Sequence, residues 1–171
     1  MSYLLKPLQA GSLALSNRLV MPPMAIAKTE DGVVNQAILD YYQEKSNGGY
    51  FSLIIIEHSF ISPEGKAHPG QLSIADDHVL EGLRSLASVI HQNGSKAVMQ
   101  LSHAGSGTKQ EVIGIIPVAP SSIPHPLNGI TPKEMTKQEI TEIIQAFQDA
   151  ALHAKVAGFD GVEIHSAHGP S

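Results

Sequence analysis

Four short apolar runs recur along the chain, at residues 19–21, 51–56, 96–101 and 161–164, and polar or small residues follow each one. Runs this apolar are typical of parallel strands buried on both faces. Between them, apolar positions recur with a helical period in segments 35–48, 78–91 and 136–157. The pattern therefore predicts strands that alternate with helices.

Local signals predict where these elements begin and end. Asn35 is a predicted helix N-cap, and Thr136 with Glu139 forms a capping box ahead of the last helix. Glycines at 48–49, 94 and 158 are expected to end the three helices. Residues 4–17 alternate weakly and turn at residues 10–12, which predicts a β-hairpin. We expect one domain over residues 1–171, in the order hairpin, β-α-β-α-β-α-β.

This alternation indicates an α/β fold with a parallel sheet and right-handed crossovers. It fits either a doubly wound sheet or the first half of a (β/α)₈ TIM barrel, and periodicity alone does not decide between them. The first strand is followed by Pro22-Pro23-Met24-Ala25, where a dinucleotide-binding fold normally has a glycine-rich turn. That sequence disfavours the dinucleotide fingerprint.

The amino-acid composition limits the partners, cofactor sites and cellular location that we expect for the protein. The net charge is −5, with no basic run, so neither nucleic acid nor an acidic membrane surface is an expected partner. There are no cysteines, which excludes disulfides and thiolate metal sites. The first residues lack the long apolar stretch of a signal peptide, and no segment has the roughly 18 apolar residues of a membrane span. We expect a cytoplasmic protein.

Candidate chemistry gathers where the predicted strands end. His58 and the pair His165 and His168 follow apolar runs, and Gln100 lies at the end of one. Carboxyl ends of parallel strands meet at one edge of the sheet, which is where α/β proteins place their active sites. A connection rich in proline and serine, at residues 107–132, is also long enough to indicate a functional loop.

Several motifs in sequence order resemble the old yellow enzyme family of FMN-dependent ene-reductases, whose members are (β/α)₈ barrels. The resemblance covers almost the whole chain and is strongest to the bacterial branch. It rests on Asn17–Met24, Asp31–Val34 with Tyr41-Tyr42, Ile55–Ser59, Ser62–Lys66, Gln100–Gly105, Ala119–Ser121, Met135–His165 and His165-Ser166-Ala167-His168-Gly169.

The resemblance implies a role for each candidate residue. His165 and His168 would hold the oxygen of an α,β-unsaturated carbonyl or nitro substrate while hydride from NAD(P)H passes through FMN to the alkene. The Gln100 carboxamide would bind the pyrimidine edge of the flavin, and His58 would donate to the cofactor or line its pocket. The segment Pro22, Pro23, Met24 and Ala25 would lie against the flavin ring.

Two departures from the family pattern stand out. Ala25 replaces a Cys or Thr that tunes the flavin potential in many relatives, and alanine offers no hydrogen bond. Pro170 takes the place of the tyrosine that donates a proton to the α-carbon. For His165 and His168, the residues themselves leave two other interpretations open: a metal site with Glu163 as third ligand, or a purely structural role.

The resemblance also implies a chain truncated after the fourth barrel strand, without the later loops that bind the FMN phosphate. A half-barrel has exposed sheet edges and an uncovered inner face, so we expect it to self-associate as a homo-oligomer. The alternative to an active ene-reductase is a catalytically inactive half-barrel that assembles without cofactor.

Overall fold

The computed structural model describes residues 2–126 and 128–167. Its centre is a parallel sheet with strand order β3-β4-β5-β8. These strands are β3 (Val20–Met21), β4 (Leu53–Phe60), β5 (Lys96–Ser102) and β8 (Gly161–Ile164). Each strand neighbours the next one along the chain, without the reversal of order that defines a doubly wound sheet. The order is that of a barrel segment, so the half-barrel prediction is confirmed.

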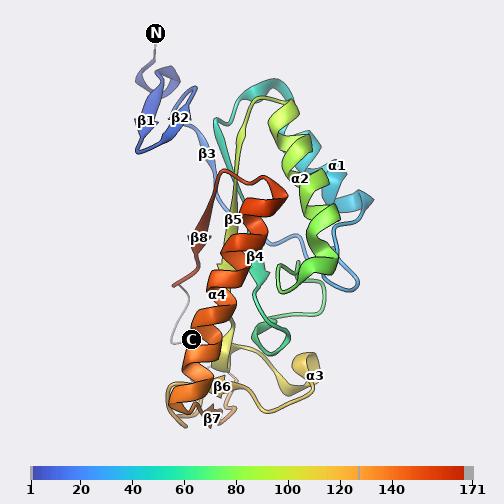
Figure 1. Ribbon diagram of the computed structural model, residues 1–171, viewed down its shortest axis with the longest axis vertical. Coiled ribbons are helices and arrows are strands. Elements are labelled where there is room, and N and C mark those ends of the chain that lie inside the picture. The colour runs from blue at the N-terminus through green and yellow to red at the C-terminus, as the bar shows by residue number, and fades with distance from the viewer. Residues whose placement is uncertain (1, 127, 168–171) are drawn as a thin grey trace.

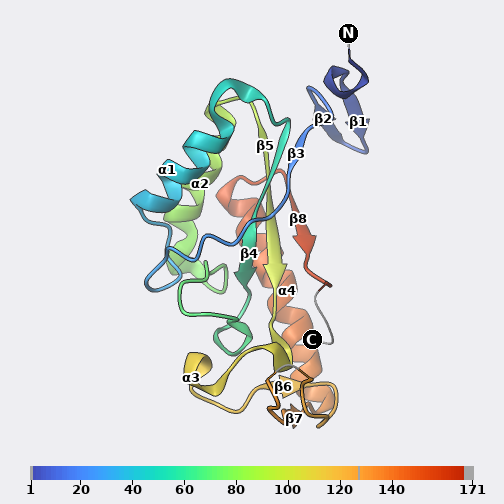
Figure 2. The same ribbon diagram turned by 180° about the vertical axis from the view of Figure 1, so that it is seen from behind.

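Three long helices connect the strands: α1 (Gln36–Ser46), α2 (Leu80–Gln92) and α4 (Lys137–Ala157). In Figure 1, α4 lies in front of the sheet, and in the reverse view of Figure 2 it lies behind it. The side chains between sheet and helices are fully or almost fully buried, among them Ile38, Ile54, Leu83 and Met99. Right-handed crossovers between sequential strands place their helices on one face of the sheet, which is the outer face in a barrel.

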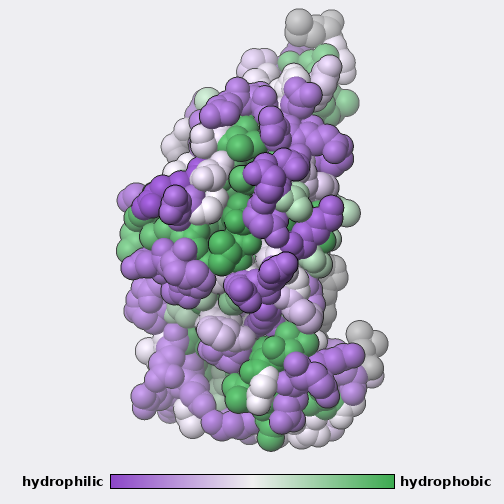
Figure 3. Space-filling model, turned by 90° about the vertical axis from the view of Figure 1, so that its right-hand side faces the viewer, coloured by the Kyte–Doolittle hydropathy of each residue, from purple (hydrophilic) through white to green (hydrophobic). Residues whose placement is uncertain are grey.

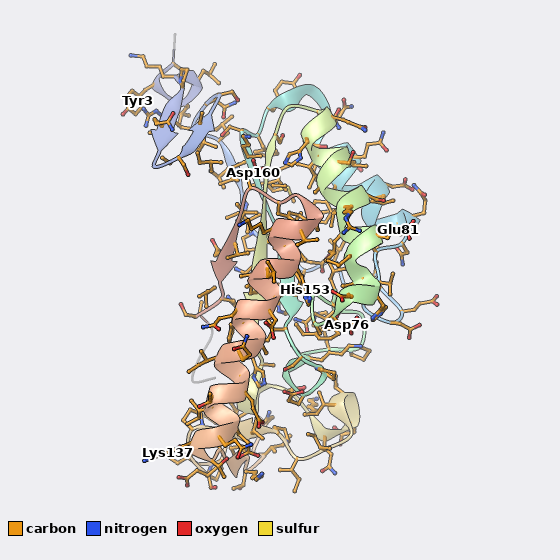
Figure 4. The ribbon with its side chains drawn as sticks, in the orientation of Figure 1. Tyr3, Asp76, Glu81, Lys137, His153 and Asp160 are labelled. Carbon is orange, nitrogen blue, oxygen red and sulfur yellow. The ribbon has the colours of Figure 1, made fainter. Side chains whose placement is uncertain are left out.

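The helix ends follow the local signals in the sequence. The Asn35 side chain accepts a hydrogen bond from the backbone N–H of Ile38 and so caps α1. Thr136 and Glu139 form the reciprocal bonds of a capping box at the start of α4. Gly158 ends α4 with φ of 93°, a conformation that glycine adopts at little cost. Figure 4 shows α4 running from Lys137 to the end where Asp160 lies.

The remaining elements lie around this sheet. The predicted hairpin is present as β1 (Leu8–Ala10) paired antiparallel with β2 (Leu13–Leu15). The long connection after β5 holds α3 (Gln110–Ile113), β6 (Val118–Ala119) and β7 (Lys133–Glu134), with β6 and β7 paired in parallel. Short 3-10 helices are η1 (Tyr3–Leu5), η2 (Asn47–Gly49), η3 (Pro63–Gly65), η4 (Asp77–Val79) and η5 (Gly105–Gly107).

One strand is longer than the sequence pattern predicts. The apolar run of residues 51–56 predicts a strand that stops before Glu57, whereas β4 continues to Phe60. The register of β4 against β5 shifts between Ile56 and Ser59, which is an irregularity of the bulge type. Such bulges re-aim side chains next to functional sites. Here Glu57 and His58 lie within the irregular segment.

The outer surface is mixed in character. Figure 3 faces the side that carries α1 and α2 and shows polar side chains interrupted by apolar patches. In the described ranges 2–126 and 128–167, no helix is long and apolar enough to cross a membrane.

Candidate active site

A cavity of about 400 Å³ lies at the carboxyl ends of the strands, within the size range of small-molecule sites. All four sheet strands lead into it. Its lining residues are Pro23, Ala25, His58, Gln100, His165 and Ala167. The fold thus brings together five of the predicted site residues: Pro23, Ala25, His58, Gln100 and His165. The first and last of these, Pro23 and His165, are 142 positions apart in the sequence.

Two other predicted site residues, Pro22 and Met24, are not among the described residues that line the cavity. Pro22 is exposed, and Met24 is 54% exposed. His168 lies outside the described residues, as do Gly169, Pro170 and Ser171. The predicted His165 and His168 pair is therefore represented in the structure by His165 alone.

A buried carboxylate holds the segment that follows β3. Glu57 is fully buried, and its Oε2 accepts hydrogen bonds from the backbone N–H groups of Ile26, at 3.0 Å, and Ala27, at 3.4 Å. Burial raises the pKa of Glu57, and these two hydrogen bonds oppose that rise. A side chain of the neighbouring strand β4 thus holds the backbone next to Ala25 in place.

The same segment contains a strained residue that the sequence did not reveal. Ala27 has φ of 50°, in the left-handed region that alanine rarely adopts. Gly70 packs against it so closely that a Cβ at Gly70 would lie 2.3 Å from the Ala27 carbonyl oxygen. Such strain persists where the surroundings over-determine it and is common at ligand sites.

Gln100 is positioned by the strand beside it. Its Nε2 donates to Oε1 of Glu163 at 2.6 Å, and the two residues are register partners in the pairing of β5 with β8. Gln100 as a whole residue is 6% exposed. Glu163 fixes one amide proton, which leaves the carbonyl oxygen and the second proton of the amide for other partners.

His58 is held by two residues of the loop after β4. Its Nδ1 lies 3.1 Å from Nε2 of Gln71, and its Nε2 lies 3.3 Å from Nε2 of His68. Gln71 is fully buried. Burial lowers the pKa of His68, and the nearby Lys66 lowers it further. The sequence does not predict a role for Gln71 or His68. The only feature that could have pointed to them is that they are polar residues in the loop that precedes the apolar Leu72.

His165 follows β8 and continues its pairing with β5. Its backbone N–H donates to the Leu101 carbonyl at 2.9 Å, and its ring centroid lies 5.9 Å from that of His58. Glu163, the third member of the alternative metal site, is the partner of Gln100. Within residues 2–126 and 128–167, no group of three or more His, Cys, Asp or Glu residues could hold a metal ion.

A second, mainly apolar cavity of about 140 Å³ also reaches His165. Its walls come from the end of β5, the long connection and α4, and they are His103, Gly105, Val118, Ala119, Met135, Ile143, Phe147 and His165. Burial lowers the pKa of His103, so this wall favours the neutral imidazole. The long connection thus contributes to the surroundings of the site.

This arrangement suits a flat, partly polar ligand. Pro23 and Ala25 are small, apolar residues that allow close approach to the backbone, Gln100 supplies an amide edge, and His165 supplies an imidazole. An imidazole that faces a substrate oxygen can stabilise negative charge as it develops there.

Comparison with known proteins agrees with this geometry. The sequence profile of the NADH:flavin oxidoreductase / NADH oxidase family matches residues 3–169. An NADH oxidase of Thermoanaerobacter brockii is 46% identical over 93% of this chain and 25% of its own length. An NADPH dehydrogenase of Geobacillus sp. (strain WCH70) is 44% identical over 98% of this chain and 49% of its own. The chain therefore spans between a quarter and a half of these relatives.

Solved structures agree as well. Morphinone reductase in complex with tetrahydroNAD superposes with a TM-score of 0.89 at 32% identity, over 98% of this chain and 50% of that protein. The old yellow enzyme homologue from Zymomonas mobilis gives a TM-score of 0.87 at 31% identity, over 99% and 50%. The sequential parallel sheet, the cavity at its carboxyl end and these matches together place the chain in the NADH:flavin oxidoreductase / NADH oxidase family, as a half-barrel of the old yellow enzyme type.

Proposed function

We propose that this chain forms the flavin-facing and substrate-holding half of an FMN-dependent oxidoreductase that uses NADH or NADPH to reduce activated alkenes, such as α,β-unsaturated carbonyls. The observation that carries the proposal is the single cavity that joins Ala25, Gln100 and His165. Each comes from a different strand end, as expected for a barrel active site.

The residues present fit the ring system of FMN. A planar ring needs a flat, apolar wall with close backbone approach, and Pro23 with Ala25 provides one. Its pyrimidine edge carries both donors and acceptors, which a carboxamide such as Gln100 can match. Among the described residues that line the cavity there is no lysine or arginine to serve as a comparable partner for the phosphate. In barrels of this kind the phosphate site lies in loops after strands 7 and 8.

Bound FMN would supply the hydride that reaches the β-carbon of the alkene. His165 would bind the substrate oxygen and stabilise the negative charge that develops there as the hydride arrives. By analogy with oxyanion-hole deletions, removal of such a donor costs on the order of 3 kcal/mol of transition-state stabilisation. His168 would be the second donor, and Gln100, held by Glu163, would orient the ring. The proton for the α-carbon would come from outside the described residues.

The apolar cavity beyond His165 supports a substrate with an apolar group next to its activating oxygen. Phe147, Ile143 and Met135 form apolar walls there. A substituent in that cavity would hold the oxygen close to His165, which is a gain in orientation rather than in chemistry.

The test begins with FMN binding by the purified chain. We expect added FMN to bind, shown by quenching of its fluorescence, and Gln100→Leu to weaken that binding several-fold. His165→Ala should leave FMN binding intact and lower the rate of NADPH-driven reduction of 2-cyclohexenone by about a hundredfold or more. His78→Ala, at a surface histidine of η4 just before α2, is the matched control and should change neither quantity.

A chain that is colourless, does not take up FMN and has no NADPH-dependent activity would support the alternative of a catalytically inactive half-barrel.

A further inference from the structure

The two ring nitrogens of His58 are both used by the protein itself. Nδ1 lies 3.1 Å from Nε2 of Gln71, and Nε2 lies 3.3 Å from Nε2 of His68. Whether each partner donates or accepts a hydrogen bond decides which ring nitrogen of His58 carries the proton.

The orientation of the Gln71 amide is fixed at both ends. Its Oε1 accepts from the backbone N–H of Ala67 at 2.6 Å. Its Nε2 lies 3.1 Å from each of two oxygens, the His58 carbonyl oxygen and the Ser102 hydroxyl oxygen. A flipped amide would put oxygen against the carbonyl and NH₂ against an N–H group. The group facing Nδ1 of His58 is therefore an amide donor.

The proton on His58 is fixed as a consequence. The two amide protons of Gln71 are shared among Nδ1 and the two oxygens, and the amide nitrogen cannot accept a hydrogen bond, so a proton on Nδ1 would face a donor group. A neutral imidazole therefore carries its proton on Nε2 and donates it to His68. His68 then holds its own proton on Nδ1, a buried atom without a partner among residues 2–126 and 128–167. Gln71 itself is fully buried, so water does not compete for its donors.

We propose that Gln71 is a positioning residue that locks His58 as the Nε2–H tautomer, so that the imidazole forms a fixed wall of the flavin cavity and not a donor to the flavin or substrate. This inference rests on the proposed function for the identity of the ligand. It also separates the two histidines of the cavity: His165 acts on the substrate oxygen, and His58 limits the shape of the site.

The nature of the wall follows from its geometry. His58 lines the same cavity as Pro23, Ala25 and Gln100, and its ring is held from two sides. A planar group held in advance can contact a flat ligand without losing rotamer freedom on binding. Contact between the imidazole and the flavin should therefore favour FMN binding, and loss of that contact should weaken FMN binding.

The tautomer can be measured in the chain without any ligand. Long-range ¹H–¹⁵N spectra, recorded at mildly alkaline pH where histidines are neutral, distinguish Nδ1–H from Nε2–H. We expect the Nε2–H form for His58 in the parent and a mixture in Gln71→Leu. Gln92→Leu, a substitution of an exposed glutamine on α2, is the control and should keep the parent pattern. An Nδ1–H form, or a mixture in the parent chain, would overturn the inference.

FMN titration then tests the role of the wall. We expect FMN to shift the His58 resonances, His58→Ala to weaken FMN binding several-fold, and Gln71→Leu to weaken it similarly. Because Gln71 acts through His58, its substitution should have little further effect in a His58→Ala background, which a double-mutant cycle measures. Independent, additive effects, or FMN binding that leaves His58 unshifted, would contradict the proposal. Failure of the parent to bind FMN would instead contradict the proposed function, while the tautomer still decides the role of Gln71.

Discussion

The carboxylate of Glu57 lies 3.0 Å from the backbone nitrogen of Ile26, and this contact ties the end of β4 to the segment after β3. The carboxylate is fully buried, and its second oxygen, Oε1, has no partner within the described part of the chain. One wall of the candidate site therefore depends on one buried acidic residue.

Replacement of Glu57 by leucine should destabilise the protein. It would leave the N–H groups of Ile26 and Ala27 without their acceptor, at a cost of about 1–3 kcal/mol for each group that stays buried. Glu57→Gln keeps one acceptor oxygen and should cost less. Urea denaturation of the three proteins measures the difference, and a Leu variant as stable as the parent would contradict the role given to Glu57.

The ionisation of Glu57 should also make stability depend on pH. Burial raises its folded-state pKa above the unfolded value of about 4.3, so the folded state holds the proton more tightly. Its contribution is fully present below about pH 4.3 and is lost as the pH rises through the folded pKa. We expect the stability of the parent relative to Glu57→Gln to fall over that window. A constant difference would show that Glu57 does not titrate as described.

Gly70 should not tolerate a side chain. A Cβ there would lie 2.3 Å from the Ala27 carbonyl oxygen, which is backbone and cannot move aside alone. We expect Gly70→Ala to cost about 1–3 kcal/mol and to weaken FMN binding through the shifted segment. Gly107→Ala is the control, since its Cβ would meet nothing within 4 Å, and it should change stability by less than about 0.5 kcal/mol. Equal stability of the two variants would count against this packing.

Asp160 should contribute to stability at neutral pH but not in acid. It accepts hydrogen bonds from the Ala97 N–H, from Lys96 and from His91, and so fixes the turn between α4 and β8 to its neighbours. Burial opposes its ionisation, but these hydrogen bonds outweigh burial and lower its pKa. Its contribution is therefore present above the unfolded pKa of about 3.9 and is lost as the pH falls through the folded pKa.

Thermal unfolding of Asp160→Asn tests this linkage. We expect the variant to be less stable than the parent at neutral pH, with a difference that shrinks below about pH 3.9. A difference that persists unchanged in strong acid would assign the effect to shape rather than to charge.

The chain should associate with a second copy through its last strand. Val162 and Ile164 are 39% and 62% exposed, although their register partners Met99 and Leu101 lie beneath the helices. Nearby on α4, Ile144 is 53% exposed. Sedimentation should show dimers or larger species, and Ile164→Asp should shift the population toward monomer. A parent chain that sediments as a monomer at high concentration would contradict this expectation.

The sequence was most informative where the structure depends on local chemistry. The capping box at Thr136, the N-cap at Asn35 and the strand at 161–164 follow from residues within a few positions of one another, and each is confirmed. The predicted end of β4 was wrong by several residues. Glu57 is stabilised within the strand by hydrogen bonds to the segment after β3, where its partner Ile26 lies 31 positions away in the sequence.

By itself, the sequence determined the alternation of strands and helices and the motifs of the old yellow enzyme family, because period, caps and turns are local properties of the chain. Periodicity alone left the strand order open and the family motifs implied a barrel; the tertiary structure confirmed that the strands lie in sequential order. It also decided that Pro22 and Met24 stay outside the cavity lining, and that Gln71, His68 and Glu57 support it. These relationships depend on sheet register, burial and contacts between distant segments, which no local pattern encodes.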